Sequence, residues 1–392
     1  QLKYDADARQ AIYRARRENP NARIVVAGCF AQRAPEEAAR LEGVTWVVGN
    51  THKHMLAEIV QSETERILVG DISAERTFAG VPAAPVSDGR TRPNLKVQDG
   101  CDCRCSFCVV PRVRGPSRSA PPEEVVRAVR NLVPRYSEIV LSGVNLGRWG
   151  RELRPPMRLA DLLRRLLAET GVARLRLSSV EPLDLKDDLL ELMASTPRIA
   201  QHIHAPLQSG SDAVLRRMRR WYRARHYAGR ILKVRAAMPD AAIGADVLVG
   251  FPGETEAEFD GTRALIERLP LTYLHVFTYS ARPGTAAASM DGQVAVRERK
   301  RRNRILREIA AAKNLAFRQT MAGKRLAALP IADGTTALTG NYLKVELAAP
   351  RPANRIVEVE IAGVTSDGLR ERLALPADAV PGVLQNHASR SQ

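Results

Sequence analysis

The chain has 392 residues, of which 45% are hydrophobic, and its 60 Lys and Arg against 43 Asp and Glu give a formal net charge of +17. This composition excludes a disordered or fibrous chain and is typical of a globular protein with two or three domains. No apolar run reaches the length of a membrane span and no secretory signal is visible, so we expect a cytoplasmic protein that does not enter a membrane. The positive charge favours a polyanionic partner, with nucleic acid first and an anionic membrane surface second. The alternative is a merely basic protein from an arginine-rich proteome.

Residues 1–80 alternate between helical and strand-like stretches. The pattern predicts helices at 7–18 and 35–41 and strands at 24–27 and 45–48. This βαβ-like order favours a parallel sheet, and therefore an N-terminal parallel α/β domain over 1–80. Residues 81–95 are rich in Pro, Ala and Ser and are interpreted as a linker.

Residues 96–322 contain six apolar runs separated by helical stretches. The runs centre on Val97 and on residues 139–141, 175–177, 202–204, 247–249 and 274–277. Six such units predict an open (β/α)6 barrel, in which reactive groups gather where strands end and loops begin. A basic helix at 297–313 ends this domain.

The remaining residues change to a period of two, clearest at 355–361. Short alternating runs predict a small β-barrel over 323–375. Residues 376–392 have no periodicity and are interpreted as a fraying tail. The overall expectation is an α/β chain of three domains.

Four of the five cysteines lie within eight residues, and Cys101, Cys105 and Cys108 form a Cys-x₃-Cys-x₂-Cys triplet. Three thiolates can hold three irons of a four-iron cluster and leave the fourth iron open for chemistry. A zinc site would need a second cysteine pair, and a chain of this size has no need of disulfides. We interpret Cys103 as an inert thiol; the alternative is a misregistered ligand that competes with Cys105.

Polar or glycine-rich motifs follow the predicted strands at 142–145, 178–182, 208–211 and 250–254. A glycine in such a turn lets the backbone approach a ligand closely. The alternative for Ser178 and Ser211 is that they cap the helices that follow. His202 and His204 alternate on one strand and are interpreted as barrel-lining residues rather than a metal pair.

The segments 96–101, 106–111 and 114–119 resemble the radical S-adenosylmethionine (SAM) loop of the methylthiotransferase family, and the resemblance extends over about residues 1–370. It implies a SAM-binding 4Fe–4S cluster on Cys101, Cys105 and Cys108, cleavage of SAM to a deoxyadenosyl radical, and a C-terminal barrel of the RNA-binding TRAM type. The family usually has a polar residue where this chain has Cys103. By position in the motifs, the expected SAM-binding residues are Phe107, Ser142, Gly143, Asn145, Ser179, Glu181, Gln208 and Ser211.

The segment 28–32, Gly-Cys-Phe-Ala-Gln, resembles the family motif that supplies one of three ligands to a second 4Fe–4S cluster. Cys29 would be that ligand, and the other two lie upstream in the family. Because the chain begins in mid-pattern at Gln1, we expect an N-terminally incomplete sequence that binds one cluster well and the second poorly or not at all.

The substrate follows from the C-terminal barrel and the charge. Residues 338–345 resemble the branch that adds a methylthio group to C2 of N6-threonylcarbamoyladenosine beside the tRNA anticodon. The alternatives are the isopentenyladenosine branch, the branch that modifies an aspartate of a ribosomal protein, and an RNA-binding protein that has lost sulfur insertion. We expect the tRNA anticodon stem-loop and an electron donor such as flavodoxin or ferredoxin as partners. Basic residues and aromatics expected at the RNA are Arg219, Arg220, Trp221, Tyr342 and Lys344.

Overall fold

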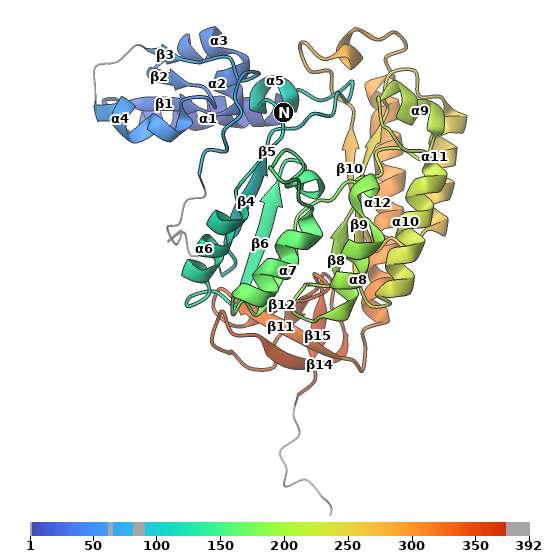
Figure 1. Cartoon of the computed structure of the whole chain (residues 1–392). Coiled ribbons are helices and arrows are strands. Elements are labelled where there is room, and N and C mark those ends of the chain that lie inside the picture. Colours follow the sequence, from blue (N-terminus) through green and yellow to red (C-terminus); the bar gives the residue numbers. More distant parts are fainter. Residues whose placement is uncertain (1, 62–65, 81–90, 374–392) are drawn as a thin grey trace, which may run out of the picture.

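The structure, a computed structural model, describes residues 2–61, 66–80 and 91–373, with the backbone alone at residues 2–5 (Figure 1). Within these residues no helix is both long and apolar enough to cross a membrane.

The N-terminal region is a small parallel sheet with helices around it. Its strands β1 (Ile24–Ala27), β2 (Val44–Val48) and β3 (Ile67–Leu68) pair in that order. The predicted strands and helices are present, although the first helix begins earlier than expected. The helices are α1 (Leu2–Glu18), α2 (Cys29–Arg33), α3 (Pro35–Ala39), η1 (Lys53–Met55) and α4 (Leu56–Gln61).

Each of the six predicted apolar runs of the central region lies in a strand. Strands β4 (Asn94–Asp99), β6 (Glu138–Gly143) and β7 (Arg174–Leu177) are parallel, with β5 (Arg118–Ser119) antiparallel at the edge. Strands β8 (His202–His204), β9 (Ala242–Val249) and β10 (Tyr273–Thr278) form a second parallel sheet. A parallel bridge between Leu175 and Ile199 joins the two sheets. The predicted linker ended at residue 95, whereas β4 already begins at Asn94.

Helices cover one face of these strands, as Figure 1 shows. They are α6 (Pro122–Leu132), α7 (Leu159–Glu169), α8 (Asp187–Ser195), α10 (Ala224–Ala237), α11 (Glu256–Arg268) and α12 (Val296–Gln319), which packs on β10. The short helix α5 (Val110–Arg114) lies against α2, and α9 (Asp212–Arg217) and the turns η2 (Leu146–Arg148), η3 (Pro182–Asp184) and η4 (Ala286–Ser289) lie in the segments that follow strands.

The two faces of the central strands differ in polarity because successive side chains alternate between them. Leu95, Val97, Ile139 and Leu141 are buried in the core beneath the helices. The alternate positions face inward and are polar in several strands, with Gln98, Arg176, His202, His204 and Asp246 among them. The inner face is therefore suited to a polar ligand.

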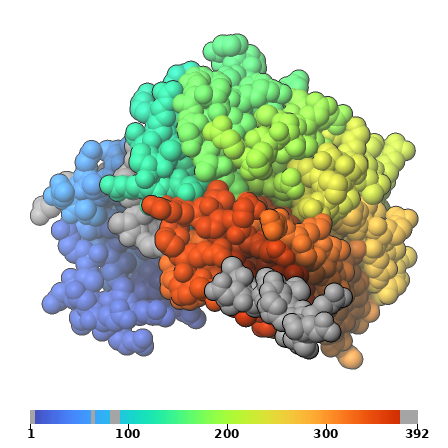
Figure 2. All heavy atoms as spheres, turned by 90° about the horizontal axis from the view of Figure 1, so that it is seen from below, coloured from blue at the N-terminus to red at the C-terminus, as the bar shows by residue number. Residues whose placement is uncertain are grey.

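The C-terminal region is a closed five-stranded barrel that packs at the amino ends of the central strands (Figures 1 and 2). The strand order is β11-β12-β13-β15-β14, and α12 (Val296–Gln319) leads into it. The strands are β11 (Arg325–Ile331), β12 (Thr336–Thr339), β13 (Lys344–Glu346), β14 (Val357–Val364) and β15 (Leu369–Glu371). The predicted tail lies outside the described residues.

A buried ion cluster joins this barrel to the central strands. Glu138 is fully buried on β6 and accepts hydrogen bonds from Arg174 Nε at 2.6 Å and Arg176 Nε at 2.7 Å. The same two guanidinium groups donate to barrel carbonyls, Arg174 to Ala327 at 3.0 Å and Arg176 to Thr339 at 2.9 Å. Burial works to raise the pKa of Glu138, but the positive charges of Arg176 and Arg174 outweigh it and lower that pKa to about 2.

Candidate functional site

The cysteine loop begins where β4 ends, and close backbone packing fixes its start. Gly100 has a φ of 70°, and a Cβ there would lie 1.8 Å from the carbonyl oxygen of Pro116, so only glycine fits. The next residue, Cys101, donates its backbone N–H to Gly115 O at 3.0 Å. The first predicted cluster ligand is therefore anchored by the backbone on both sides of the loop.

Gln98 ties this loop to the turn after the neighbouring strand. Its buried amide donates to Asp99 O at 2.9 Å and to Ser117 Oγ at 3.0 Å, and it accepts the backbone N–H of Asn145 at 2.7 Å. Because Gly143 has no side chain, Gln98 can pack against it; a Cβ there would lie 2.9 Å from Gln98 Cβ. Gln98 was not predicted as a site residue.

Each of the three predicted ligand sulfurs has an N–H donor. The backbone N–H of Cys103 points at Cys101 Sγ and that of Val110 at Cys108 Sγ, both at 3.4 Å. Arg220 Nη1 lies 3.4 Å from Cys105 Sγ. Hydrogen bonds to the sulfurs are the main means by which a protein tunes an iron–sulfur cluster, so this donor set fits one.

The three predicted ligand sulfurs do not all lie within 4.8 Å of one another. Among the residues that the structure describes, the only group of three ligating side chains with all ligand atoms within 4.8 Å is His204, Asp246 and His275. The cysteine sulfurs are more widely spread, whereas a tetrahedral zinc ion with Zn–S bonds of about 2.3 Å would draw them closer.

The His204, Asp246 and His275 group has a simpler explanation than a metal. His204 Nε2 and His275 Nδ1 lie 3.0 and 3.3 Å from the same oxygen, Asp246 Oδ1. Two hydrogen bonds to one carboxylate oxygen account for this geometry. Tyr273 binds both His202 Nε2, at 2.7 Å, and His204 Nδ1, at 3.0 Å, so both histidines line the barrel as predicted.

Cys103 lies beside Cys101 and is partly buried. Its hydrogen bond to Cys101, together with burial, raises the pKa of the Cys103 thiol, and the same bond lowers the pKa of Cys101. Burial raises the pKa of Cys105 and of Cys108. The contact between the two thiols therefore shifts their pKa values in opposite directions, down for Cys101 and up for Cys103.

Asn145, a predicted SAM-binding residue, reaches the cysteine loop from the turn after β6. Its side-chain nitrogen lies 3.7 Å from both Cys101 Sγ and Cys103 Sγ. Its buried Oδ1 has no hydrogen-bond partner among the described residues. An unused buried acceptor beside a cluster ligand fits the amino group of SAM. Ser142 and Gly143 are half-buried at the end of β6, and Val144 separates them from Asn145.

Arg220 lies in a different place from the one predicted. It was expected at the RNA, but its side chain is only 7% exposed and pairs with Glu181 and with Cys105. The chain turns at Arg219, which has a φ of 57°, and this turn sends Arg220 inward while Trp221 stays 78% exposed. Glu181 thus reaches the cysteine loop through Arg220.

The other predicted SAM-binding residues are spread around the carboxyl ends of the strands. The ring of Phe107 packs edge-on against Phe251, and Ser179 is exposed. Gln208 forms a parallel bridge with Val247. Ser211 caps α9 by accepting from Val214 N at 3.4 Å, whereas Ser178 caps no helix.

Tyr342 and Lys344 lie at the opposite end of the strands from Arg219 and Trp221, as Figure 1 shows for β12 and α9. The Tyr342 ring packs on His202 with centroids 4.6 Å apart, and Lys344 pairs with Asp367 at 3.3 Å. The predicted RNA contacts therefore do not form one patch.

Cys29 is the first residue of α2 and lies against the helix that follows the cysteine loop. Arg114 of α5 donates Nε to Cys29 Sγ at 3.0 Å and Nη1 to Asp99 at 3.4 Å. Asn50 also spans this contact, from Cys29 Sγ at 3.6 Å to Val113 O at 2.6 Å. Burial opposes the charge of Arg114, but Cys29 and Asp99 outweigh it and raise the pKa of Arg114. Sequence motifs did not indicate this bridge, because its members come from three separate segments.

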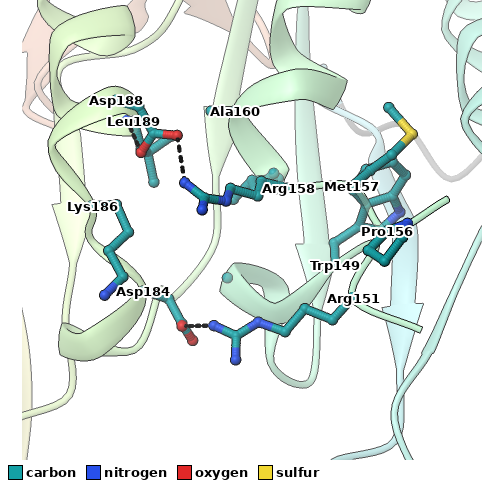
Figure 3. A pocket seen from close by; sticks show the side chains of 12 residues that line it. Trp149, Arg151, Pro156, Met157, Arg158, Ala160, Asp184, Lys186, Asp188 and Leu189 are labelled. Carbon is teal, nitrogen blue, oxygen red and sulfur yellow. Dashed lines mark hydrogen bonds and ion pairs between the residues drawn. The ribbon is translucent and has the colours of Figure 1, made fainter. Parts of the chain in front are cut away.

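A separate cavity of about 480 Å³ lies between the starts of α7 and α8 (Figure 3). Four of its charged groups form two ion pairs, Arg151 with Asp184 and Arg158 with Asp188. No predicted site residue lines it.

Residues 95–266 match the family model of the Radical SAM superfamily. The chain is 38% identical over 362 residues to the threonylcarbamoyladenosine tRNA methylthiotransferase MtaB of Aquifex aeolicus, covering 91% of this chain and 87% of that protein. It is 37% identical to the MtaB of Rickettsia prowazekii, covering 92% and 85%. A tRNA-2-methylthio-N(6)-dimethylallyladenosine synthase of Parafrankia is 41% identical, covering 72% and 58%.

Among solved structures, the radical SAM methyltransferase TsrM of Kitasatospora setae aligns with a TM-score of 0.54 at 17% identity, over 72% of this chain and 62% of that one. This likeness concerns the fold alone. The cysteine triplet at the strand ends, the matched superfamily and the relatives at 37–38% identity agree, and the chain belongs to the radical SAM methylthiotransferases of the MtaB family.

Proposed function

We propose that this protein adds a methylthio group to C2 of N6-threonylcarbamoyladenosine beside the anticodon of tRNA. The observation that carries this proposal is the coverage of the relatives. The chain aligns with 85–87% of the MtaB proteins of Aquifex, Rickettsia and Thermotoga. The net charge of +17 supports a polyanionic substrate.

Cys101, Cys105 and Cys108 would hold a 4Fe–4S cluster with one open iron. Asn145 Oδ1 would accept a hydrogen bond from the amino group of SAM. Such a cluster would supply the electron for the reductive cleavage of SAM. The protein's own part is positional: Gln98 holds the cysteine loop against β6, and Arg220 holds Cys105 and Glu181 together.

Cys29 would be one ligand of a second 4Fe–4S cluster. The printed sequence has no further cysteine outside residues 101–108. One thiol does not hold a cluster, so no chemistry is assigned to this site. Cys29 nonetheless lies near the SAM cysteine loop, because Arg114 connects Cys29 to Asp99 at the base of that loop.

The proposed domains, electron donor and location follow from membership of this family. We propose a methylthiotransferase domain over 1–80, a radical SAM domain of six βα units over 96–322, and a TRAM-type RNA-binding barrel over 323–375. Flavodoxin or ferredoxin would serve as the electron donor, and the protein would work in the cytoplasm.

The second candidate substrate is the dimethylallyl-modified adenosine. It is kept because relatives with that name reach 41% identity, but the chain covers only 52–69% of their length. The test is anaerobic incubation of the reconstituted protein with SAM, dithionite and tRNA carrying either modified adenosine, followed by mass spectrometry of the nucleosides. We expect methylthio product from the threonylcarbamoyl tRNA alone. Product from the dimethylallyl tRNA alone would overturn the proposal, and deoxyadenosine without either product would show that sulfur insertion is missing.

A further inference from the structure

A second cavity, of about 560 Å³, lies between the C-terminal barrel and the inner face of the central strands; it extends from Arg92, near the amino end of β4, to Ser178, which follows the last residue of the short strand β7. It is lined on the inner face of the strands by Arg92, Asn94, Arg176, Ser178 and His202, and from the barrel by Tyr342. We call it the floor cavity. It is distinct from the cavity of Figure 3, which lies between the starts of α7 and α8 and shares no lining residue with it.

Two buried polar atoms of the floor cavity have no partner among the described residues. They are Ser178 Oγ and His202 Nδ1. His202 is only 6% exposed, and its other ring nitrogen is already bound to Tyr273. A buried polar group without a partner is unfavourable, so the two atoms indicate a polar ligand that satisfies both.

The charge of the floor cavity is positive. Three guanidinium groups, of Arg92, Arg174 and Arg176, face the single carboxylate of Glu138. Arg174 and Arg176 also bind the barrel carbonyls, so their N–H groups are used. In the described part of the chain, Arg92 makes one contact, from Nη1 to Glu138 at 3.3 Å, and its side chain is 26% exposed. Arg92 is therefore the cation that remains available to an anion.

The position of the floor cavity suits the far end of a substituted base. The cysteine loop follows Asp99 at the carboxyl end of β4, and Asn94 is at the other end of this strand. At about 3.3 Å per residue, the strand separates the two by about 16 Å. Along this length, the cofactor would lie nearest the cysteine loop and the adenine beside it. The substituent on N6 of the adenine would then extend into the floor cavity.

We propose that the floor cavity binds the threonine carboxylate of the modified adenosine, with Arg92 as its cation and Ser178 and His202 as its hydrogen-bonding partners. This inference rests on the proposed function. A dimethylallyl group has no charge and no hydrogen-bonding atom, so in this cavity it would offer no partner to Arg92, Ser178 or His202. A site that hydrogen-bonds a substrate group rejects analogues that lack it far more strongly than an apolar pocket does.

The test measures equilibrium binding of synthetic anticodon stem-loops to the reconstituted protein with SAM present. One stem-loop carries threonylcarbamoyladenosine and the other the corresponding threonine amide, so the phosphates are identical and the carboxylate charge alone differs. For the unchanged protein we expect at least tenfold tighter binding of the carboxylate form. Arg92→Gln should reduce this ratio to about one, and Arg92→Lys should restore part of it. Ser178→Ala removes a hydroxyl that has no partner in the described fold, so a fall in the ratio would report ligand contact rather than lost structure.

The matched control is Arg325→Gln, which removes a positive charge from an exposed side chain of the C-terminal barrel. It should weaken both stem-loops equally and leave the ratio unchanged. A ratio near one in the unchanged protein would overturn the carboxylate site, and so would an unchanged ratio in Arg92→Gln. Methylthio product formed from threonylcarbamoyl tRNA in the same preparation would keep the proposed function standing after such a result. Failure to bind either stem-loop would overturn both.

Discussion

The two ends of the central strands are built in opposite ways. At the carboxyl ends, the cysteine loop is held by contacts within the central region, such as Gln98 to Asn145 and Arg220 to Cys105, and the buried acceptor Asn145 Oδ1 has no partner among the described residues. At the amino ends, Arg174 and Arg176 both donate to Glu138 and also to the carbonyls of Ala327 and Thr339, which lie more than 150 positions away in the chain. The first end is prepared for a ligand, and the second mainly joins two regions of the chain.

The comparison has a practical consequence. Variants at the carboxyl ends should lose cofactor or chemistry with little loss of stability, whereas variants of the ion cluster at the amino ends should lose stability first. The floor cavity is the exception, since it places free groups beside a closed ion cluster.

The largest effect is expected from the cysteines. Cys105→Ser should lose most of the bound iron and abolish deoxyadenosine formation, because two thiolates do not hold a cluster with a defined open iron. Iron content and deoxyadenosine after anaerobic reconstitution measure this. Cys103→Ser is the matched control and should retain both. Equal losses in the two variants would show that the ligand register is wrong.

The next effect concerns stability at the amino ends. Glu138→Gln leaves two buried guanidinium groups without their carboxylate, which should cost about 3–5 kcal/mol of unfolding free energy. Denaturant unfolding of the reconstituted protein measures it. Glu169→Gln breaks a half-exposed pair with Arg165 and should change the free energy by less than about 1 kcal/mol. If the two variants were equally stable, the ion cluster would not hold the two regions together.

The same carboxylate predicts a dependence of stability on pH. The folded pKa of Glu138 is lowered from 4.5 to about 2, so its contribution is fully present above pH 4.5 and is lost as the pH falls toward 2. The total is about 3 kcal/mol. Unfolding free energies between pH 6 and pH 3 should therefore fall more steeply for the unchanged protein than for Glu138→Gln. Parallel curves would contradict this assignment.

A tenfold loss of deoxyadenosine formation is expected from a variant of Arg220. This variant distinguishes a role beside the cysteine loop from a role in RNA binding. Arg220→Met removes the donor to Cys105 and the partner of Glu181, so deoxyadenosine formation should fall about tenfold while tRNA affinity is unchanged. Arg219→Met, one residue earlier and exposed, should weaken tRNA binding and its salt dependence without affecting SAM cleavage. The opposite pattern would place Arg220 at the RNA after all.

The smallest effect is expected at Ser211. Ser211→Ala removes the cap of α9 and should cost about 1 kcal/mol of stability, with no change in the KM for SAM. A tenfold rise in that KM with unchanged stability would make Ser211 a SAM ligand instead of a cap.

Much of the fold could be predicted from the sequence, because its strands are short apolar runs with local signals. All six central runs lie in strands, and the period of two near residue 357 belongs to the closed barrel. The errors lie where tertiary contacts decide. Arg220 was expected at the RNA from charge alone, yet a turn at Arg219 buries it against Cys105.

By itself, the sequence determined the cysteine triplet, the order of the strands along the chain and the family. Each of these depends on motifs whose residues are close together in the chain. The tertiary structure alone decided which groups meet across long separations. It brought Arg114 to Cys29 and Asp99, enclosed Glu138 between two arginines, and placed Ser178, His202 and Arg92 around one cavity. Partners of this kind leave no local signal, since burial and charge pairing act between segments that only the folded chain brings together.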